Sequence, residues 1–379
     1  MSEVTIDRSS TLDTLFEPAQ IAGLSVRNRF VMAPMTRCES PDGRPTTEVA
    51  TYYGRRAQGG VGLIITEGTS VGHPAASNDS NIPRFEGDAL PGWKQVVDSV
   101  HAGGARIVPQ LWHAGLLRKW HAHGVKHGYG ARQDVSPSGW LNSDEKICDP
   151  MSIDDIEAVV TAFGAAAHDA HELGFDGIEL QGAHGYLIDQ FLWAGTNRRD
   201  DRYGGTLGRR SQFAADIVAE CRRMTTPDFP IIFRFSQWKQ QDYTAQLATT
   251  PEELEQVLSP LCDAGVDIFH PSQRRYWQPE FDGSDRTLAG WTRKVTGKPA
   301  IIVGSVGLAL DLRQAGFAAG AAAEVASLER IPAMFDRGEF DLVAVGRLMV
   351  GNPEWCNAVR AGHLADIKPY SSEMLARLT

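Results

Sequence analysis

The chain has 379 residues, of which 42% are hydrophobic and 22% charged, which is ordinary for a globular protein and excludes a disordered or fibrous one. The 37 basic and 47 acidic side chains give a net charge of -10, and no long basic run suggests nucleic-acid binding. No apolar stretch is long enough to span a membrane, and the N-terminus does not resemble a signal peptide. The five scattered cysteines fit reduced thiols. We therefore expect a cytoplasmic protein with neither nucleic acid nor membrane as partner. Separately, we expect a monomer or homodimer whose partner is a small-molecule substrate.

Eight short runs rich in apolar and β-branched residues follow one another along the chain. Near-continuous apolar runs of this length are typical of strands buried on both faces of a parallel sheet. The runs are Arg29–Thr36, Gly62–Ser70, Arg106–His113, Gly177–His184, Ile231–Trp238, Asp267–Gln273, Pro299–Val306 and Leu342–Met349.

Segments with helical spacing lie between these runs. Ser152 and Asp155 form a capping-box-like start, and several helices are expected to stop at a glycine. Strands alternating with helices predict an α/β fold, a TIM (β/α)8 barrel. A doubly wound open sheet is the alternative, but a dinucleotide-binding GxGxxG is missing after the first strand. The expected helices are Thr46–Gln58, Leu90–Ala102, Ser152–Leu173, Leu207–Met224, Thr250–Ala264, Asp285–Thr296 and Pro353–Ala361.

The chain is expected to form one domain over residues 1–379, with residues 116–151 as a lid or capping insertion after the third strand. Within it, the His-rich stretch 120–130 lacks cysteines and carboxylates at ligand spacing, so we expect no metal site. The charged stretch 198–203 (RRDDRY) is interpreted as a solvated ion-pair cluster that fixes the helix after the fourth strand.

Active sites of such barrels lie at the C-terminal ends of the strands. There the seventh strand ends in VGSVG and the eighth in VGR, and these two ends predict a phosphate-bearing ligand. Arg234 stands inside an apolar strand, where a charge is costly unless it pairs with a carboxylate or faces an anionic cofactor edge. The amide of Gln110 can donate and accept at once, which suits a flat heterocycle.

Several segments between Leu15 and Gly362 resemble the Old Yellow Enzyme family of FMN-dependent ene-reductases. The resemblance implies a barrel that holds FMN non-covalently and uses NADPH or NADH as co-substrate. The most specific segment is the long stretch from GYL to YGG. The segments are LFEPAQIAGLSVRNRFVMAPMTR, PQLWHAG, SPSG, AHGYLIDQFLWAGTNRRDDRYGGTLGRR and GRLMVGNPEW.

The resemblance also implies roles for individual residues. Those near the isoalloxazine would be Ala33, Pro34, Met35 and Thr36 along the ring, Gln110 at the pyrimidine edge and Arg234 at the N1–C2 edge. Those at the phosphate would be Gly304, Ser305, Gly346 and Arg347. The substrate pocket would be lined by Trp112, Trp238, Tyr276 and Trp277, unless these aromatic residues only pack.

The implied reaction is the NAD(P)H-dependent reduction of an alkene conjugated to a carbonyl or nitro group, in two successive hydride transfers. Gln181 and His184 would bind the substrate oxygen, and Tyr186 would donate a proton to the α-carbon. A phenol is a sensible donor because its pKa near 10 keeps it protonated at pH 7.

This sequence departs from the family motif at Gln181, where the family has His. An amide stays neutral, so the bond it donates is weaker than one from a cationic imidazole. Either activity on simple enones is retained but lower, or the site serves a specialised substrate as a flavin-dependent isomerase or desaturase. A binding module without activity is a further rival. We treat Cys38 as structural, and we expect none of the Cys-rich domains found in some longer relatives.

Overall fold

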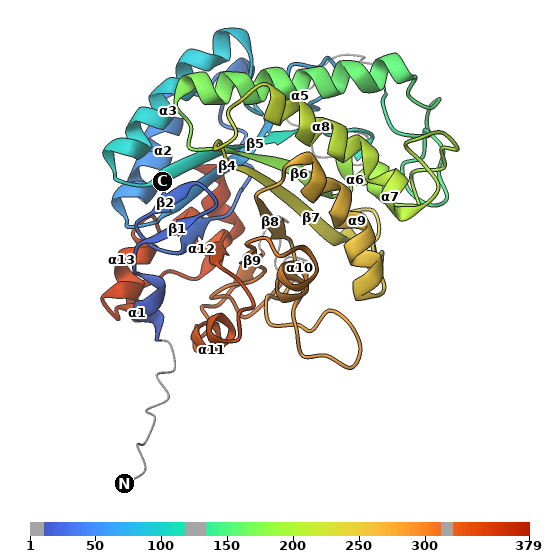
Figure 1. Ribbon diagram of the computed structural model, residues 1–379. Helices are drawn as coiled ribbons and strands as arrows, with labels where there is room; N and C mark the ends of the chain where they lie inside the picture. The colour runs from blue at the N-terminus through green and yellow to red at the C-terminus, as the bar shows by residue number, and fades with distance from the viewer. Residues whose placement is uncertain (1–10, 118–133, 312–320) are drawn as a thin grey trace.

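The computed structural model describes residues 11–117, 134–311 and 321–379 (Figure 1). Its main sheet has eight parallel strands in the order β8-β7-β6-β5-β4-β3-β11-β9. Parallel bridges from Phe269 to Ala300 and from Ser272 to Val303 join the two outer strands, so the sheet closes into a barrel. The TIM barrel is therefore confirmed, and the open-sheet alternative is wrong. The strands are β3 (Phe30–Met32), β4 (Leu63–Ser70), β5 (Arg106–Trp112), β6 (Ile178–His184), β7 (Ile231–Lys239), β8 (Ile268–Pro271), β9 (Ile301–Val303) and β11 (Leu342–Val345).

All eight predicted strands exist, but four of them are shorter than expected. The strands β3, β8, β9 and β11 contain only three or four residues, because the chain leaves the hydrogen-bonded ladder before the predicted end. Pro34 has no N–H to donate to a ladder, and Gly304 takes a φ of +131°. The residues predicted to bind a cofactor on these strands consequently lie beyond the strand ends, Arg347 at the start of the following helix and the others in loops.

Helices surround the barrel, as Figure 1 shows. The predicted starts are confirmed at Thr46 and Thr250 and at the capping box of Ser152 with Asp155, and Gly174 and Gly265 end their helices in the left-handed conformation. One helix was predicted wrongly: Leu207–Met224 is divided at residue 211 into two helices. The helices are α1 (Leu12–Leu15), α2 (Thr47–Gln58), α3 (Leu90–Ala102), α5 (Ile153–Leu173), α6 (Leu187–Leu192), α7 (Leu207–Arg210), α8 (Gln212–Arg223), α9 (Pro251–Ala264), α10 (Leu288–Thr296), α11 (Arg330–Asp336), α12 (Arg347–Gly351) and α13 (Trp355–Arg360).

The N-terminal half of the barrel interior is a separate apolar layer. Side chains alternate across a strand, so every second residue points inward. The short hairpin of β1 (Ala19–Ile21) and β2 (Leu24–Val26) packs against this layer. A second small pair, β10 (Ala322–Ala323) with β12 (Tyr370–Ser371), is antiparallel. The inward strand residues of the layer are Val31, Leu63, Ile65, Val108, Ile232, Ile268, Ile301, Val303, Leu342 and Ala344.

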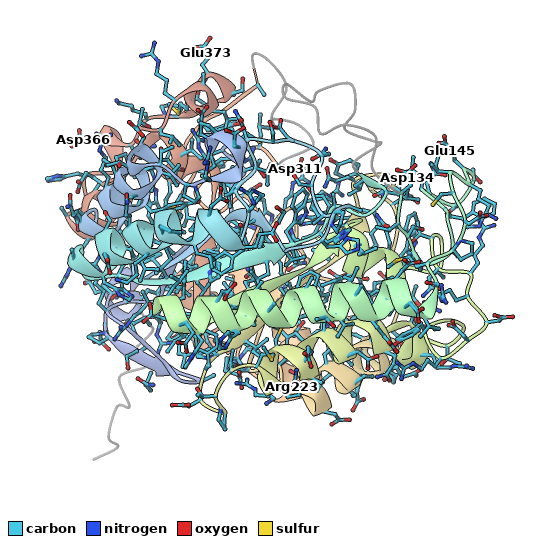
Figure 2. All side chains as sticks on the ribbon, turned by 90° about the horizontal axis from the view of Figure 1, so that it is seen from above. Asp134, Glu145, Arg223, Asp311, Asp366 and Glu373 are labelled. Atoms are coloured by element: carbon cyan, nitrogen blue, oxygen red, sulfur yellow. The ribbon has the colours of Figure 1, made fainter. Side chains whose placement is uncertain are left out.

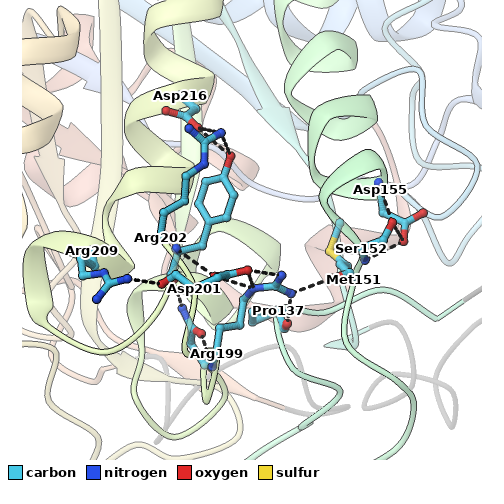
Figure 3. A network of polar contacts seen from close by, with 11 residues as sticks. Pro137, Met151, Ser152, Asp155, Arg199, Asp201, Arg202, Arg209 and Asp216 are labelled. Atoms are coloured by element: carbon cyan, nitrogen blue, oxygen red, sulfur yellow. Dashed lines mark hydrogen bonds and ion pairs between the residues drawn. The ribbon is translucent and has the colours of Figure 1, made fainter.

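Residues 116–117 and 134–151 of the predicted insertion are described, and its His-rich stretch lies outside the described residues. Figure 2 shows Asp134 and Glu145 of this segment on the opposite side of the molecule from Asp366. Arg199 binds the segment: its guanidinium donates to the carbonyls of Pro137 (2.7 Å) and Met151 (2.6 Å) (Figure 3).

The charged stretch 198–203 forms the predicted ion-pair cluster. Arg199 pairs with Asp201 at 2.6 Å, and Arg202 pairs with Asp216 of α8 at 3.3 Å (Figure 3). Arg209 of α7 donates to the carbonyl of Asp201. The cluster therefore connects the loop after β6 to the following helices, and through Arg199 also to the insertion.

Within the described ranges, no helix combines the length and the apolar composition needed to cross a membrane.

Candidate active site

Two residues beyond the apolar layer, the barrel interior becomes polar. The same inward-facing rows continue from aliphatic to polar side chains along three strands. The steps are Val108 to Gln110, Ile232 to Arg234 and Ile268 to His270. All three polar side chains are almost completely buried, so each needs partners within the protein or a ligand.

Glu179 on β6 connects these three side chains. Its carboxylate accepts a hydrogen bond from Gln110 Nε2 at 2.7 Å, lies 2.6 Å from His270 Nδ1 and is 4.0 Å from Arg234 Nη1. Burial by itself would raise the pKa of Glu179, but His270, Arg234 and Gln110 together lower it. Burial lowers the pKa of His270, so we take its ring as neutral, with Nδ1–H donating to the carboxylate.

The sequence reasoning missed both Glu179 and His270. A signal was available, because each is a titratable residue inside an apolar run, GIELQ and DIFHP, as Arg234 is in IIFRF. Arg234 was expected either to pair with a carboxylate or to face a cofactor. The structure combines both features: Arg234 Nη1 approaches Glu179, while Arg234 Nε has no hydrogen-bond partner in the described part of the chain.

Three buried polar atoms near this cluster have no hydrogen-bond partner among the described residues: Arg234 Nε, His270 Nε2 and the amide Oε1 of Gln181. Gln181 lies directly opposite Arg234 in the β6–β7 register. A buried polar atom without a partner costs about 1–3 kcal/mol, so three together indicate a place for a polar ligand. A flat heterocycle with donors and acceptors along one edge, such as the isoalloxazine of FMN, fits this set of atoms.

The two predicted phosphate ends lie together. Arg347 begins α12, and its Nη2 donates to Ser305 Oγ at 3.2 Å and to the carbonyl of Leu310 at 2.8 Å. Only glycine fits at Gly304, because a Cβ there would lie 2.3 Å from the carbonyl oxygen of Gln273. A guanidinium beside such a tight turn fits a phosphate group.

The loop after β3 adjoins this phosphate end. Ala33 N–H donates to the carbonyl of Val345 at 2.9 Å, and a Cβ on Gly346 would contact Met35 Sδ at 3.1 Å. Pro34 is half-buried and Thr36 is exposed. These contacts bring the predicted flavin-lining loop next to the predicted phosphate residues.

A further carboxylate that the sequence reasoning missed holds the continuation of this loop. Glu67 Oε2 accepts the backbone N–H groups of Arg37 (2.7 Å) and Cys38 (3.1 Å). Burial raises the pKa of Glu67 to about 7, even though these two hydrogen bonds lower it. Cys38 has a φ of +55°, and its side chain packs beside Trp112 and Tyr186.

His184 lies at the end of β6, where an indole and a serine hydroxyl contact its ring. Its ring stacks on the indole of Trp238, with centroids 4.5 Å apart, and its Nε2 is 2.8 Å from Ser272 Oγ. Burial, followed by the charges of Arg234 and Lys239, lowers the pKa of His184 far below its ordinary value. The imidazole is therefore neutral at pH 7.

Tyr186 follows after one glycine and precedes α6 (Leu187–Leu192). The edge of its ring meets Trp112, with centroids 5.3 Å apart and planes at 86°. Removal from water raises the pKa of Tyr186 above its ordinary value of 10. The phenol therefore keeps its proton throughout the physiological range.

Two of the four predicted pocket aromatics join this group, and two do not. Trp112 contacts Tyr186, and Trp238 contacts His184. Tyr276, however, is buried in the larger hydrophobic core, which strand and helix residues form together, and Trp277 packs against that same core. Among the described residues, therefore, only Trp112 and Trp238 of this predicted set contact the candidate substrate residues.

The fold and this site define a flavin-binding α/β barrel. Residues 14–365 match the family model for the NADH:flavin oxidoreductase / NADH oxidase family, so the chain belongs to this family, and the Old Yellow Enzyme resemblance is confirmed. Members are FMN-dependent oxidoreductases that use NAD(P)H, and FMN is accordingly the cofactor of this chain.

Among solved structures, morphinone reductase in complex with tetrahydroNAD is similar with a TM-score of 0.76 and 27% identity, covering 95% of this chain and 93% of that one. An Old Yellow Enzyme homologue from Zymomonas mobilis is similar with a TM-score of 0.76 and 25% identity, covering 96% of each chain.

Among curated proteins, an NADH oxidase of Thermoanaerobacter brockii is 35% identical over 93% of this chain and 52% of its own length. The flavin oxidoreductase hxnT of Emericella nidulans is 30% identical over 93% of this chain and 92% of its own length. The chain thus spans about half of the NADH oxidase but nearly all of hxnT. Our expectation that no further domain accompanies the barrel stays a prediction.

Proposed function

We propose that this protein reduces the C=C bond of alkenes conjugated to a carbonyl or nitro group, with NADPH or NADH as the electron source, in a ping-pong sequence. The observation that carries the proposal is the strand-end group of Gln181, His184 and Tyr186 beside the buried Arg234. FMN, when bound, supplies the hydride chemistry that connects the nicotinamide to the alkene. Arg234, Gln110 and the Ser305–Arg347 pair are the residues that would hold it.

Gln181 and His184 would bind the substrate oxygen. Negative charge develops on that oxygen when a hydride adds to the β-carbon, and preorganised donors stabilise it. In this chain the amide is always neutral, and the low pKa of His184 keeps the imidazole neutral as well. Hydrogen bonds from neutral donors are weaker than charge-assisted ones, so we expect slow turnover of simple enones.

Tyr186 would deliver the proton to the α-carbon. Its raised pKa keeps the phenol protonated, and the edge contact with Trp112 restricts the orientation of its ring. The position of Tyr186 directly after His184 and Gly185 couples proton delivery to binding of the substrate oxygen.

The test is anaerobic assay of the purified, FMN-loaded protein with 2-cyclohexenone and either nicotinamide. Tyr186→Phe should lower kcat by about 100-fold or more, the usual contribution of a general acid, without changing reduction of FMN by NADPH. Gln181→His should raise enone turnover. A wild-type protein that does not bind FMN would support the rival binding module and contradict the proposal.

Gln181 also favours one second candidate, an isomerase or desaturase acting on a specialised substrate. Its Oε1 is buried without a partner among the described residues, and an amide can accept a hydrogen bond from a substrate as well as donate one. Conversion of an alkene without consumption of NAD(P)H would support this candidate over the reductase.

A further inference from the structure

The backbone at His184 has an unusual conformation that several side chains maintain. His184 has a φ of +65°, a region that residues with a Cβ rarely occupy, and Gly185 follows with +83°. The N–H of His184 donates to Ser236 Oγ at 2.9 Å, and the N–H of Gly185 donates to Asp189 Oδ2 at 2.7 Å. The turn is therefore held by side-chain acceptors from β7 and α6.

A buried ion pair supports these acceptors. Lys239 Nζ lies 2.6 Å from Asp189 Oδ1, and neither side chain is exposed to solvent. The same ammonium donates to the carbonyl of Ser236 at 2.9 Å. Lys239 therefore connects both residues that hold the turn, and breaking such a buried pair would leave an uncompensated charge.

The side chain of His184 is fixed by Ser272, the residue that follows β8. Ser272 Oγ lies 2.8 Å from His184 Nε2, while the carbonyl of Ser272 accepts the indole N–H of Trp238 at 3.0 Å. Trp238 in turn covers a face of the imidazole. Ser272 thus contacts the ring directly and also positions the indole stacked on it.

This geometry leaves one nitrogen of His184 for a substrate. Among the described residues Nδ1 has no hydrogen-bond partner, and Ser272 Oγ has none other than His184. A neutral imidazole carries a single N–H, so Nδ1 can donate only if Nε2 accepts from the serine hydroxyl. In the opposite tautomer, Nε2 would donate to Ser272 and the lone pair of Nδ1 would repel a carbonyl oxygen.

We propose that Ser272 is a positioning residue that selects the tautomer of His184: its hydroxyl donates to Nε2 and thereby keeps the proton on Nδ1, ready to donate to the substrate oxygen. The inference rests on the proposed binding of a substrate oxygen by His184. It adds a determinant from the residue after β8, whereas the sequence motif lies at the end of β6. Polarisation of the substrate would then depend on Ser272, although Ser272 would not contact the substrate.

The experiment combines nitrogen NMR with ligand binding on the FMN-loaded protein. Protein labelled with ¹⁵N-histidine would give the tautomer of His184, whose signals are identified by their absence in His184→Gln. We expect Nδ1–H in the wild type. Ser272→Ala should shift the ring toward Nε2–H and weaken binding of 4-hydroxybenzaldehyde by about five- to tenfold, the worth of roughly one hydrogen bond. Ser272→Thr, which keeps a hydroxyl, should restore both.

Ser211→Ala is the matched control, because Ser211 is also completely buried but lies at the α7–α8 junction. Ser211→Ala should change neither the tautomer of His184 nor the affinity for 4-hydroxybenzaldehyde. Nε2–H in the wild type would overturn the proposal, even if Ser272→Ala failed to fold. The proposal would also be overturned if Ser272→Ala left both the tautomer of His184 and the affinity for 4-hydroxybenzaldehyde unchanged. Failure of the proposed function is seen separately, as wild-type protein that does not reduce 2-cyclohexenone.

Discussion

The two halves of the barrel interior are built on the same strands but differ in chemistry. The N-terminal half is filled by aliphatic side chains such as Val108, Ile232 and Ile268. Two residues further along the same strands stand Gln110, Arg234 and His270, joined by Glu179. The first half stabilises the barrel by burial of apolar surface, whereas the second buries polar groups that are only partly satisfied by the protein.

The difference shows how one fold separates stability from function. Polar atoms without partners oppose folding, whereas the apolar layer beneath them favours it by burying its side chains. A cofactor that bound the folded chain at the polar half and supplied the missing partners would offset part of this cost. Changes in the lower half should therefore act on stability alone. Changes in the upper half should act on stability, cofactor affinity or pH dependence, according to the residue.

The largest effect is expected for Glu179→Leu. The substitution leaves the charge of Arg234 buried without its carboxylate, which should lower the free energy of unfolding by about 3–5 kcal/mol. Urea unfolding of the FMN-free protein measures it. The matched variant in the apolar layer is Ile232→Val, for which about 0.5–1.5 kcal/mol is expected. If both variants lowered the free energy of unfolding by the same amount, the polar and apolar halves of the barrel interior would not differ as described.

Arg234→Leu and Arg347→Leu should separate the two ends of the cofactor. Each removes charge-assisted hydrogen bonds worth about 1.5–3 kcal/mol, or roughly 10- to 150-fold in affinity. Arg234→Leu should weaken FMN and riboflavin alike, whereas Arg347→Leu should weaken FMN and leave riboflavin, which has no phosphate, unchanged. Quenching of flavin fluorescence measures all four dissociation constants. If Arg347→Leu weakened riboflavin equally, its assignment to the phosphate would be wrong.

The last prediction concerns Glu67 and pH, and its effect is the smallest when it is counted per pH unit. Burial raises the pKa of Glu67 from 4.5 to about 7, so the folded protein holds this proton where the unfolded chain has lost it. The contribution of Glu67 to stability should consequently fall as pH rises from 4.5 to about 7, by at most about 1.4 kcal/mol per pH unit, and change no further above that. Glu67→Gln should lack this slope. Urea midpoints at pH 5, 6, 7 and 8 compare the two, and parallel curves would refute the shift.

Local sequence determined much of this protein. The spacing of apolar runs predicted eight strands, because a parallel strand covered on both faces must be apolar nearly throughout. Helix starts at Thr46, Ser152 and Thr250 followed from side chains that bond their own helix N-terminus. The turn glycines at the seventh and eighth strand ends pointed to a phosphate. These are short-range properties, and the chain encodes them within a few residues.

The tertiary structure decided which residues that are far apart in the sequence lie in contact. Glu179 meets His270 across 91 residues, and Ser272 meets His184 across 88, and neither pairing has a local pattern. For Tyr276 the sequence left a pocket role and a packing role open, and in the folded chain it packs in the core. Sequence by itself determined the barrel, its family and the strand ends that hold the site. Closure of the barrel decided which buried side chains form hydrogen bonds and ion pairs at these strand ends. Such pairings depend on the distances between strands, and only the folded chain sets those distances.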